Sequence, residues 1–339
     1  MRGVLIAGAA LAALSLGSAA PAAADPPPMG KIECDRTCLQ GVTDQVLAAM
    51  IAHDPSRLPL APDVRYTENG NALTLGDGFW GTASGQGTYR HDFLDPRTQQ
   101  AGFFGVMKEN GQDVIVAMRI ALEGRRISEI ETIYGRTGLG TAGPSGAGNL
   151  EAMGKPDDVW LQDIPAGQRA TREDLIRVSN MYFSNLQNND GKGDYSFFAD
   201  DCYRLENGFQ TTKGPHPRPP PLGGAAANAP RRPGPDMLSL TCKEGFATGY
   251  FRIVTRIRDR RFPLVDEDKG VVFAFGFFDH AGTVHNFPLS DGTISPGGLN
   301  APFTWEIAEA FKIEKGQIKT VEAVLNNVPY GSKAGWEGK

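Results

Sequence analysis

The chain has 339 residues, of which 22% are charged, and its formal net charge is −5 at pH 7. Its Lys and Arg residues form no long clustered run. Composition and charge therefore argue against a nucleic acid or an anionic membrane surface as partner, and favour a neutral or modestly polar small-molecule ligand or substrate.

The N-terminal segment, residues 1–24, has the features of a secretory signal. It begins with a charged Arg2, continues with an apolar stretch and ends in an Ala-x-Ala cleavage site before Asp25. The apolar stretch is shorter than the ~20 residues that a membrane-spanning helix needs. We therefore expect an exported protein, periplasmic or extracellular, with no membrane partner.

The next segment predicts a first domain over residues 35–134. Apolar residues at helical spacing predict an opening helix, and alternating patterns with an Asn-Gly turn at 110–111 predict the strands that follow. The helix positions are Leu39, Val42, Val46 and Met50. Residues 135–170 are rich in Gly and Pro and are expected to form a linker.

A second domain is expected over residues 171–331. Its helix has apolar residues at Leu175, Val178, Tyr182 and Leu186, and Thr171 stands at the expected N-cap. The segment 213–236 has a Pro-, Gly- and Ala-rich composition that cannot build a packed core, so it is expected to be an inserted loop.

The two predicted domains are copies of one unit, because three blocks repeat in the same order. "DVRYTENG" (63–70) aligns with "DCYRLENG" (201–208), and residues 78–111 align without a gap on 249–282. Near each end, "RISEIETI" (126–133) aligns with "QIKTVEAV" (317–324). The sequence therefore predicts an α+β fold of two tandem domains, each with a helix packed on a strongly curved antiparallel sheet.

The four cysteines allow three disulfide pairings in an exported protein. We expect Cys34 to pair with Cys38 near the first helix, and Cys202 to pair with Cys242 across the inserted loop. A zinc site is disfavoured because the cysteines do not form two CxxC pairs and no His stands at ligand spacing, so no metal is expected.

A leading helix, a short strand ending in Asn-Gly, long strands and a closing "I-x-x-[IV]-E-x-[IV]" strand resemble the cone-shaped fold of the nuclear-transport-factor and ketosteroid-isomerase (SnoaL-like) superfamily. The second half, with "FFADDCYRLENGFQTT", is similar to an uncharacterised exported family of fungi and bacteria. The resemblance implies either an enzyme that works by proton abstraction or elimination inside the cone, or a non-catalytic ligand-binding or dimerising module. It transfers no catalytic position.

The repeated Glu is the first candidate for chemistry. Strand alternation places Val64, Tyr66 and Glu68 on one face, and it places Cys202, Arg204 and Glu206 on one face of the second copy. If that face looks into the cone, burial raises the pKa of the carboxyl toward neutrality and makes it a general acid or base. The alternative is a strand end and turn, with each Glu ion-paired at the surface.

The candidate sites comprise one constellation in each domain. In the second domain Arg204 could act as an anion or carbonyl clamp beside Glu206, and His91 is a natural proton shuttle that has no counterpart in the second copy. The candidate catalytic residues are Glu206, Arg204, Tyr203 and Asn207 in the second domain, and Glu68, Tyr66 and His91 in the first.

Other recurring charges favour structural roles. An Arg stands five residues before an Asp in both copies, at Arg90 with Asp95 and at the equivalent 261 and 266, which an internal ion pair at a strand end explains most simply. The acidic pair on the closing strands, Glu131 and Glu322, is also more simply structural. His280 and His285 flank a turn and are expected to face solvent.

These observations support an exported lyase, dehydratase or isomerase that acts on a small cyclic or aromatic-bearing molecule and needs no cofactor. No dinucleotide fingerprint, P-loop or nucleophile elbow appears in a strand-turn-helix context. The alternatives are a non-catalytic ligand-binding or scaffold protein, whose two domains could pack as an intramolecular pseudo-dimer, and hydrolysis by paired carboxylates such as Asp200 or Asp201 with Glu206.

Overall fold

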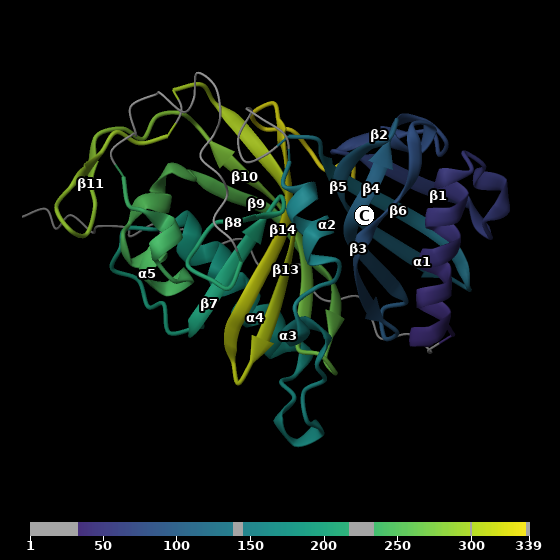
Figure 1. Cartoon of the computed structure of the whole chain (residues 1–339), viewed down its shortest axis with the longest axis horizontal. Helices are drawn as coiled ribbons and strands as arrows, with labels where there is room; N and C mark the ends of the chain where they lie inside the picture. The colour runs from purple at the N-terminus through teal and green to yellow at the C-terminus, as the bar shows by residue number, and fades with distance from the viewer. Residues whose placement is uncertain (1–32, 138–144, 217–233, 299, 337–339) are drawn as a thin grey trace, which may run out of the picture.

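The computed structural model describes residues 33–137, 145–216, 234–298 and 300–336. The predicted signal segment and most of the predicted inserted loop lie outside these described residues. Figure 1 shows two curved sheets side by side, each carrying a helix, with the first half of the chain in purple and blue and the second from teal to yellow.

The first half is a six-stranded sheet with the order β2-β1-β6-β5-β4-β3. The strand β1 runs parallel to β6, and the other neighbours are antiparallel. The elements are α1 (Arg36–Ile51), β1 (Leu60–Glu68), β2 (Asn71–Leu73), β3 (Ala83–Asp95), β4 (Gln100–Glu109), β5 (Gln112–Glu123) and β6 (Arg126–Gly135), with 3-10 turns at Pro55–Arg57 (η1) and Gly78–Gly81 (η2).

The second half repeats this topology in the order β8-β7-β14-β13-β10-β9. Its principal elements are α4 (Arg172–Gln187), β7 (Phe198–Glu206), β8 (Phe209–Gln210), α5 (Cys242–Ala247), η6 (Tyr250–Ile253), β9 (Arg256–Asp266), β10 (Val271–His280), β13 (Phe303–Glu314) and β14 (Gln317–Val328). The small hairpin of β11 (Phe287–Pro288) and β12 (Ile294–Ser295) has no counterpart in the described part of the first half. The predicted α+β fold of two tandem cone-like domains is therefore confirmed, with one parallel strand pair in each sheet.

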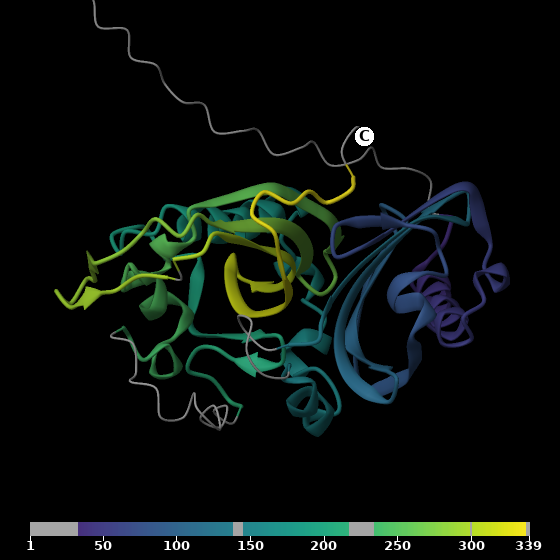
Figure 2. The same cartoon turned by 90° about the horizontal axis from the view of Figure 1, so that it is seen from above.

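The helices α1 and α4 cover the inner faces of the sheets, because packing there removes the apolar side of each helix from water. All four apolar positions predicted for each helix are buried. The side chain of Thr171 accepts a hydrogen bond from the Asp174 amide, as its predicted N-cap role requires, and Asp35 caps α1 in the same way. Figure 2 shows how the first sheet, in blue, curls around α1.

Between the two sheets, residues 147–153 form α2, 158–161 form α3 and 166–168 form η3. Leu150 and Trp160 of these short helices are buried in the same cluster as side chains from both sheets. The composition of this segment predicts a linker, and in the structure the segment packs between the two sheets and contacts both.

The outer faces of the two sheets are buried against each other. One hydrophobic cluster joins Tyr89, Phe93 and Phe104 of the first sheet to Phe273 and Phe275 of the second. The rings of Phe93 and Phe273 stack with their centroids 4.7 Å apart. A Cβ atom at Gly102 would stand 2.8 Å from the Phe273 ring, so this close approach requires glycine.

Two reciprocal ion pairs tie the halves together at the helix starts. Arg36, the first residue of α1, donates to Asp266 at the end of β9 over 2.6 Å. Arg172, the first residue of α4, donates to Asp95 at the end of β3. Each helix therefore contacts the sheet of the other half.

The predicted internal pairs of Arg90 with Asp95, and of Arg261 with Asp266, are wrong. In β3, Arg90 and Asp95 are five residues apart in a regular stretch, so they point to opposite faces of the sheet. In β9, a register shift between Arg261 and Asp266 places both on the outer face, where each pairs with a residue of the other half. Arg90 instead pairs with Asp44 and Asp92, and Arg261 pairs with Glu131 of the other half.

We expect the two reciprocal ion pairs to differ in strength. The side chains of Arg172 and Asp95 are 4% and 1% exposed, whereas that of Arg36 is 34% exposed. Removing one partner of a buried pair costs about 3–5 kcal/mol, and a solvent-screened pair contributes ~0–1 kcal/mol. In urea unfolding, we expect Arg172→Met to lower the free energy of unfolding by about 3–5 kcal/mol and Arg36→Met to lower it by about 0–1 kcal/mol. Equal losses would contradict this account.

Both expected disulfides are confirmed. Cys34 bonds Cys38 at a sequence separation of 4, and Cys202 bonds Cys242 at a separation of 40. Disulfides persist in oxidising compartments, so this pairing points to such an environment for the folded chain.

The two disulfides should contribute unequally to stability. Loop-closure entropy grows with the length of the closed loop, which predicts about 4 kcal/mol for Cys202–Cys242 and about 2 kcal/mol for Cys34–Cys38. We expect the double substitution Cys202→Ala/Cys242→Ala to lower the free energy of unfolding about twice as much as Cys34→Ala/Cys38→Ala. A larger effect of the short loop in urea unfolding would count against this ranking.

Candidate active site in the second cone

The two Asn-Gly turns that follow the repeated Glu residues each connect two neighbouring strands of their own sheet. Asn69 and Asn207 have positive φ angles of 44° and 45°, as a tight turn between β1 and β2, or β7 and β8, requires. The side-chain oxygen of Asn69 accepts a hydrogen bond from the Tyr134 amide at 3.0 Å, and that of Asn207 accepts from the Leu325 amide at 2.9 Å. Each Asn therefore extends the pairing of two parallel strands.

In the first cone, Glu68 is buried and its hydrogen bonds are satisfied. Its carboxylate accepts from the Tyr66 hydroxyl, from the Phe79 amide at 2.8 Å and from the Trp80 amide at 3.3 Å. Burial raises the pKa of Glu68, and these donors oppose the shift. A Cβ at Gly78 would stand 2.1 Å from the carboxylate. Glu68 and Tyr66 do face inward together, but they anchor the short helix η2.

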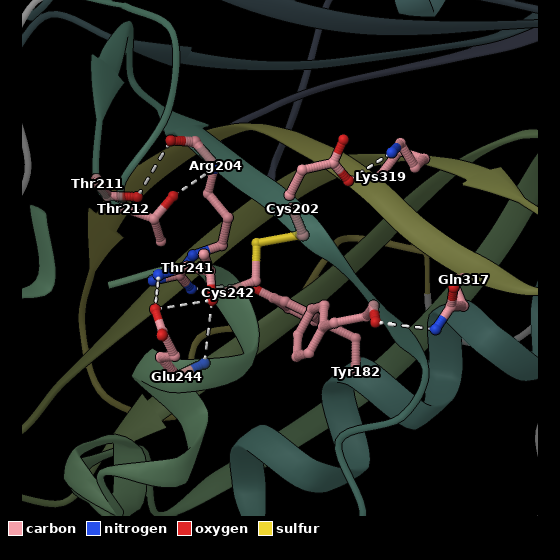
Figure 3. Close-up of a disulfide and its surroundings, with 12 residues drawn as sticks. Tyr182, Cys202, Arg204, Thr211, Thr212, Thr241, Cys242, Glu244, Gln317 and Lys319 are labelled. Carbon is pink, nitrogen blue, oxygen red and sulfur yellow. Dashed lines mark hydrogen bonds and ion pairs between the residues drawn. A yellow bond between two sulfur atoms is a disulfide. The ribbon is translucent and has the colours of Figure 1, made fainter. Parts of the chain in front are cut away.

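In the second cone, β7 directs Cys202, Arg204 and Glu206 inward, as strand alternation predicts. Figure 3 shows the side chains of Cys202 and Arg204 on the same side of β7. The Cys202–Cys242 bond fixes β7 to α5. The Arg204 guanidinium donates to the Tyr182 hydroxyl on α4 over 3.1 Å and lies 3.3 Å from the Glu206 carboxylate. Arg204 also lies over the Phe251 ring, 4.9 Å from its centroid.

A second acid, Glu309 on β13, completes this cluster. Glu206 pairs in register with Ala323 on β14, and Ala323 pairs with Glu309, so the two acids lie in one row across a small residue. Glu309 is 1% exposed, and its Oε2 has no hydrogen-bond partner among the described residues. We call Tyr182, Arg204, Glu206 and Glu309 the inner polar cluster.

The environment of the inner polar cluster shifts the protonation of its members. Burial, and then the charge of Glu206, raises the pKa of Glu309 to about 8, against a hydrogen bond from Tyr182 and the charge of Arg204. Burial raises the pKa of the Tyr182 hydroxyl as well. At neutral pH the cluster therefore holds one protonated carboxyl, one phenol and one guanidinium. Such a set can donate a proton and stabilise a developing oxyanion.

The described residues of the first cone form no equivalent cluster. Its strand register places Met118 where the second cone has Glu309, and Tyr66 stands where Arg204 does. The helices α1 and α4 both have 16 residues, and Val46 occupies the place of Tyr182. Phe79, Trp80 and Met118 pack in the core of the first cone. Its interior is therefore largely apolar.

The remaining predicted site residues lie outside both cones. His91 faces the other half, with Nδ1 2.8 Å from Glu322, which also accepts a hydrogen bond from Tyr89. Tyr203 lies on the outer face of β7 and donates to Asp157. The structure thus brings Arg204 and Glu206 together but separates them from Tyr203, Asn207 and His91.

The sequence analysis missed Glu309 and treated Tyr182 as ordinary helix core. The signal was present in β13, where Trp305, Ile307, Glu309 and Phe311 alternate toward one face. A lone acid in an otherwise apolar inward row is the pattern that could have identified it.

His280 is buried at 4% exposure, so the expectation that it faces solvent is wrong, whereas His285 is exposed. The ring of His280 stacks on Phe303 and meets Trp305 edge to face, and this aromatic packing accounts for the burial of His280. Over the described ranges, no group of three or more His, Cys, Asp or Glu side chains could hold a metal ion. No helix of the described chain is long and apolar enough to cross a membrane.

Comparisons with known proteins found a similarity to one family model over part of the chain. Residues 168–325 match a family described as "Domain of unknown function (DUF8021)". No curated protein matches the chain.

Similar solved structures each cover 46% of this chain. A de novo designed protein with a curved β-sheet matches over 88% of its own length at 11% identity and a TM-score of 0.25. AusH from Aspergillus nidulans matches over 86% at 13% identity and a TM-score of 0.26, and PrhC from Penicillium brasilianum NBRC 6234 over 83% at 14% identity and 0.24.

The raised pKa of Glu309 predicts a pH-dependent stability. The unfolded chain releases this proton near the ordinary pKa of 4.5, whereas the folded chain holds it to about pH 8. The stability contribution of the protonated group is therefore complete below pH 4.5 and is lost as the pH rises toward 8. We expect Glu309→Gln to gain about 2–4 kcal/mol of unfolding free energy relative to the parent protein between pH 5 and pH 9. A difference that does not vary with pH in urea unfolding would refute the shift.

Proposed function

We propose that the protein is an exported enzyme, a lyase, dehydratase or isomerase, that uses carboxylate acid-base chemistry in its second cone. The substrate is a small cyclic or aromatic-bearing molecule, and the reaction needs no cofactor. The observation that carries the proposal is the buried Glu309 carboxyl, which has an unpartnered oxygen beside the guanidinium of Arg204 and the phenol of Tyr182. An unsatisfied buried polar atom costs about 1–3 kcal/mol, so its retention supports a role in ligand binding or catalysis.

The roles follow from the charge of each group. Glu206, whose side chain is 16% exposed, is the general base that takes a proton from a substrate carbon. Glu309, protonated near neutral pH, returns a proton to the neighbouring atom or to a leaving hydroxyl. Arg204 and Tyr182 stabilise the negative oxygen of the enolate formed between these two transfers. Each proton removed is thus matched by one delivered.

The spacing of the two acids suits this division of labour. They stand on strands that are separated by β14, so their Cα atoms lie about 9–10 Å apart at the usual strand spacing. The residue between them is Ala323, whose small side chain occupies little space between the two carboxyl groups. We propose that the substrate ring binds between the base on one side and the acid on the other.

The first cone supports the second without chemistry of its own in this proposal. Its Glu68 is occupied by three donors, and Phe79, Trp80 and Met118 fill its core. We propose that the halves form an intramolecular pseudo-dimer in which the first cone stabilises the outer face of the second. The disulfides and the Ala-x-Ala segment support export.

Turnover by matched glutamine variants tests the proposal. The mature protein is screened against hydroxy-ketones, aromatic dimers and sugar lactones, and the best substrate is then used with Glu309→Gln and Glu306→Gln. Glu306 is the matched control because it is also buried on β13 with a pKa raised to about 8, but it faces the outer side. We expect kcat to fall about 10²–10⁴-fold in Glu309→Gln and less than about threefold in Glu306→Gln.

Equal loss in both variants would show that burial of an acid, rather than its position in the cone, matters. Unchanged turnover in Glu309→Gln would remove Glu309 from the mechanism. Binding of a screened compound without conversion would instead favour the ligand-binding alternative.

A further inference from the structure

The second cone contains another pair of polar atoms that its fold leaves unsatisfied. His280 is the last residue of β10, and Trp305 lies near the start of β13. Their rings meet edge to face with centroids 4.5 Å apart, and Phe303 stacks on His280 at 4.3 Å. The Nε2 atom of His280 and the Nε1 atom of Trp305 are both buried without a hydrogen-bond partner among the described residues.

Both side chains lie on the inner face of the sheet, the same face as the inner polar cluster. Phe278, two residues before His280, contacts Phe183 on α4. Ile307, two residues after Trp305, belongs to the same inner core. Because residues two apart in a strand share a face, His280 and Trp305 face inward as well.

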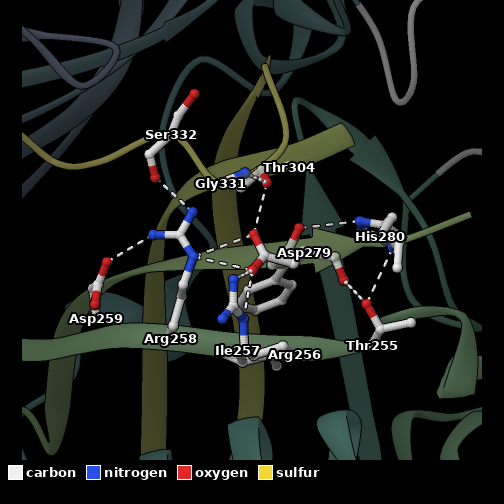
Figure 4. A network of polar contacts seen from close by, with 12 residues as sticks. Thr255, Arg256, Ile257, Arg258, Asp259, Asp279, His280, Thr304, Gly331 and Ser332 are labelled. Carbon is white, nitrogen blue, oxygen red and sulfur yellow. Dashed lines mark hydrogen bonds and ion pairs between the residues drawn. The ribbon is translucent and has the colours of Figure 1, made fainter. Parts of the chain in front are cut away.

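The other neighbour on β10, Asp279, turns away from this pair. Figure 4 shows its carboxylate between Arg256, Arg258 and Thr304. Asp279 therefore does not satisfy the His280 or Trp305 nitrogen atoms.

The tautomer of His280 follows from its other ring nitrogen. Nδ1 lies 3.0 Å from the Phe278 carbonyl oxygen, which can only accept, so Nδ1 carries the hydrogen. Burial lowers the pKa of His280 to about 4, so the ring is neutral at pH 7. Nε2 is then an acceptor, whereas the Trp305 indole N–H is only a donor. The pair thus offers one acceptor and one donor beside aromatic surfaces.

A hydroxyl group both donates and accepts, and therefore matches this pair. We propose that His280 and Trp305 bind a hydroxyl carried on a planar ring of the substrate, away from the reacting carbon. This inference rests on the proposed function, because it assigns a second contact to the substrate of the same cone. Trp305 and Glu309 stand four residues apart on β13, about 13–14 Å at the usual rise, so the substrate that reaches both has more than one ring.

Two bicyclic probes separate the two hydrogen bonds. 2-Naphthol can donate and accept, whereas 2-methoxynaphthalene keeps the accepting oxygen but has no proton to donate. By isothermal titration calorimetry we expect the intact protein to bind 2-naphthol at least about tenfold more tightly, the effect of one hydrogen bond to a buried acceptor. The preference should fall below about twofold in His280→Phe.

Trp305→Phe is the second variant, since it keeps an aromatic ring and removes only the N–H donor. It should weaken both probes several-fold and leave their ratio near the value of the intact protein. Far-UV circular dichroism verifies that each variant is folded. Glu309→Gln should keep the preference for 2-naphthol, which separates this inference from the proposed chemistry.

Three results would overturn the inference. They are equal affinity of the intact protein for the two probes, no binding of 2-naphthol, and a preference that survives in folded His280→Phe. If the two nitrogens hold only structural water, or the rings only fill the core, the probe ratio will not depend on His280. If Glu309→Gln loses turnover but keeps the affinity ratio of the two probes, the inference stands, and the loss concerns only the inner polar cluster.

Discussion

The structure depends on the burial of two curved sheets against each other through their outer faces. A sheet that covers one face with a helix still exposes the other to water, and here each half supplies the cover for its neighbour. The stacked rings of Phe93 and Phe273 and the reciprocal pairs at Arg36 and Arg172 fix this arrangement. Charged groups buried at that junction, such as Glu131 and Glu322, therefore have interface partners and structural roles.

This packing leaves the inner faces free to diverge. The first cone has Met118 and Val46 at positions where the second has Glu309 and Tyr182, and its repeated acid, Glu68, is held by backbone amides. The second cone keeps an unpartnered carboxyl oxygen, that of Glu309, in the same cluster as the Arg204 guanidinium. One half thus contributes stability while the other maintains a costly polar interior, which is the usual relation between stable scaffolds and functional sites.

Features that depend on local sequence could be predicted, and features that depend on contacts between distant strands could not. Helix faces, the Thr171 cap, the disulfides and the repeat all follow from spacing along the chain. The partner of Asp95 could not be predicted because Arg172 belongs to the other half of the molecule. The alternation of β13 could have marked Glu309 as an inward acid, but its alignment with Glu206 depends on the register of β13 against β14. Tyr203 and Glu206 are three residues apart on β7, so strand alternation alone was sufficient to place their side chains on opposite faces.

The central claim is that Glu309 keeps its proton at neutral pH inside the second cone, and carboxyl carbon NMR of ¹³C-Glu protein measures this directly. With the resonance assigned through Glu309→Gln, the account predicts a titration midpoint near pH 8 for this carboxyl. A midpoint below about 5, in the range of an ordinary solvated glutamate, would contradict it.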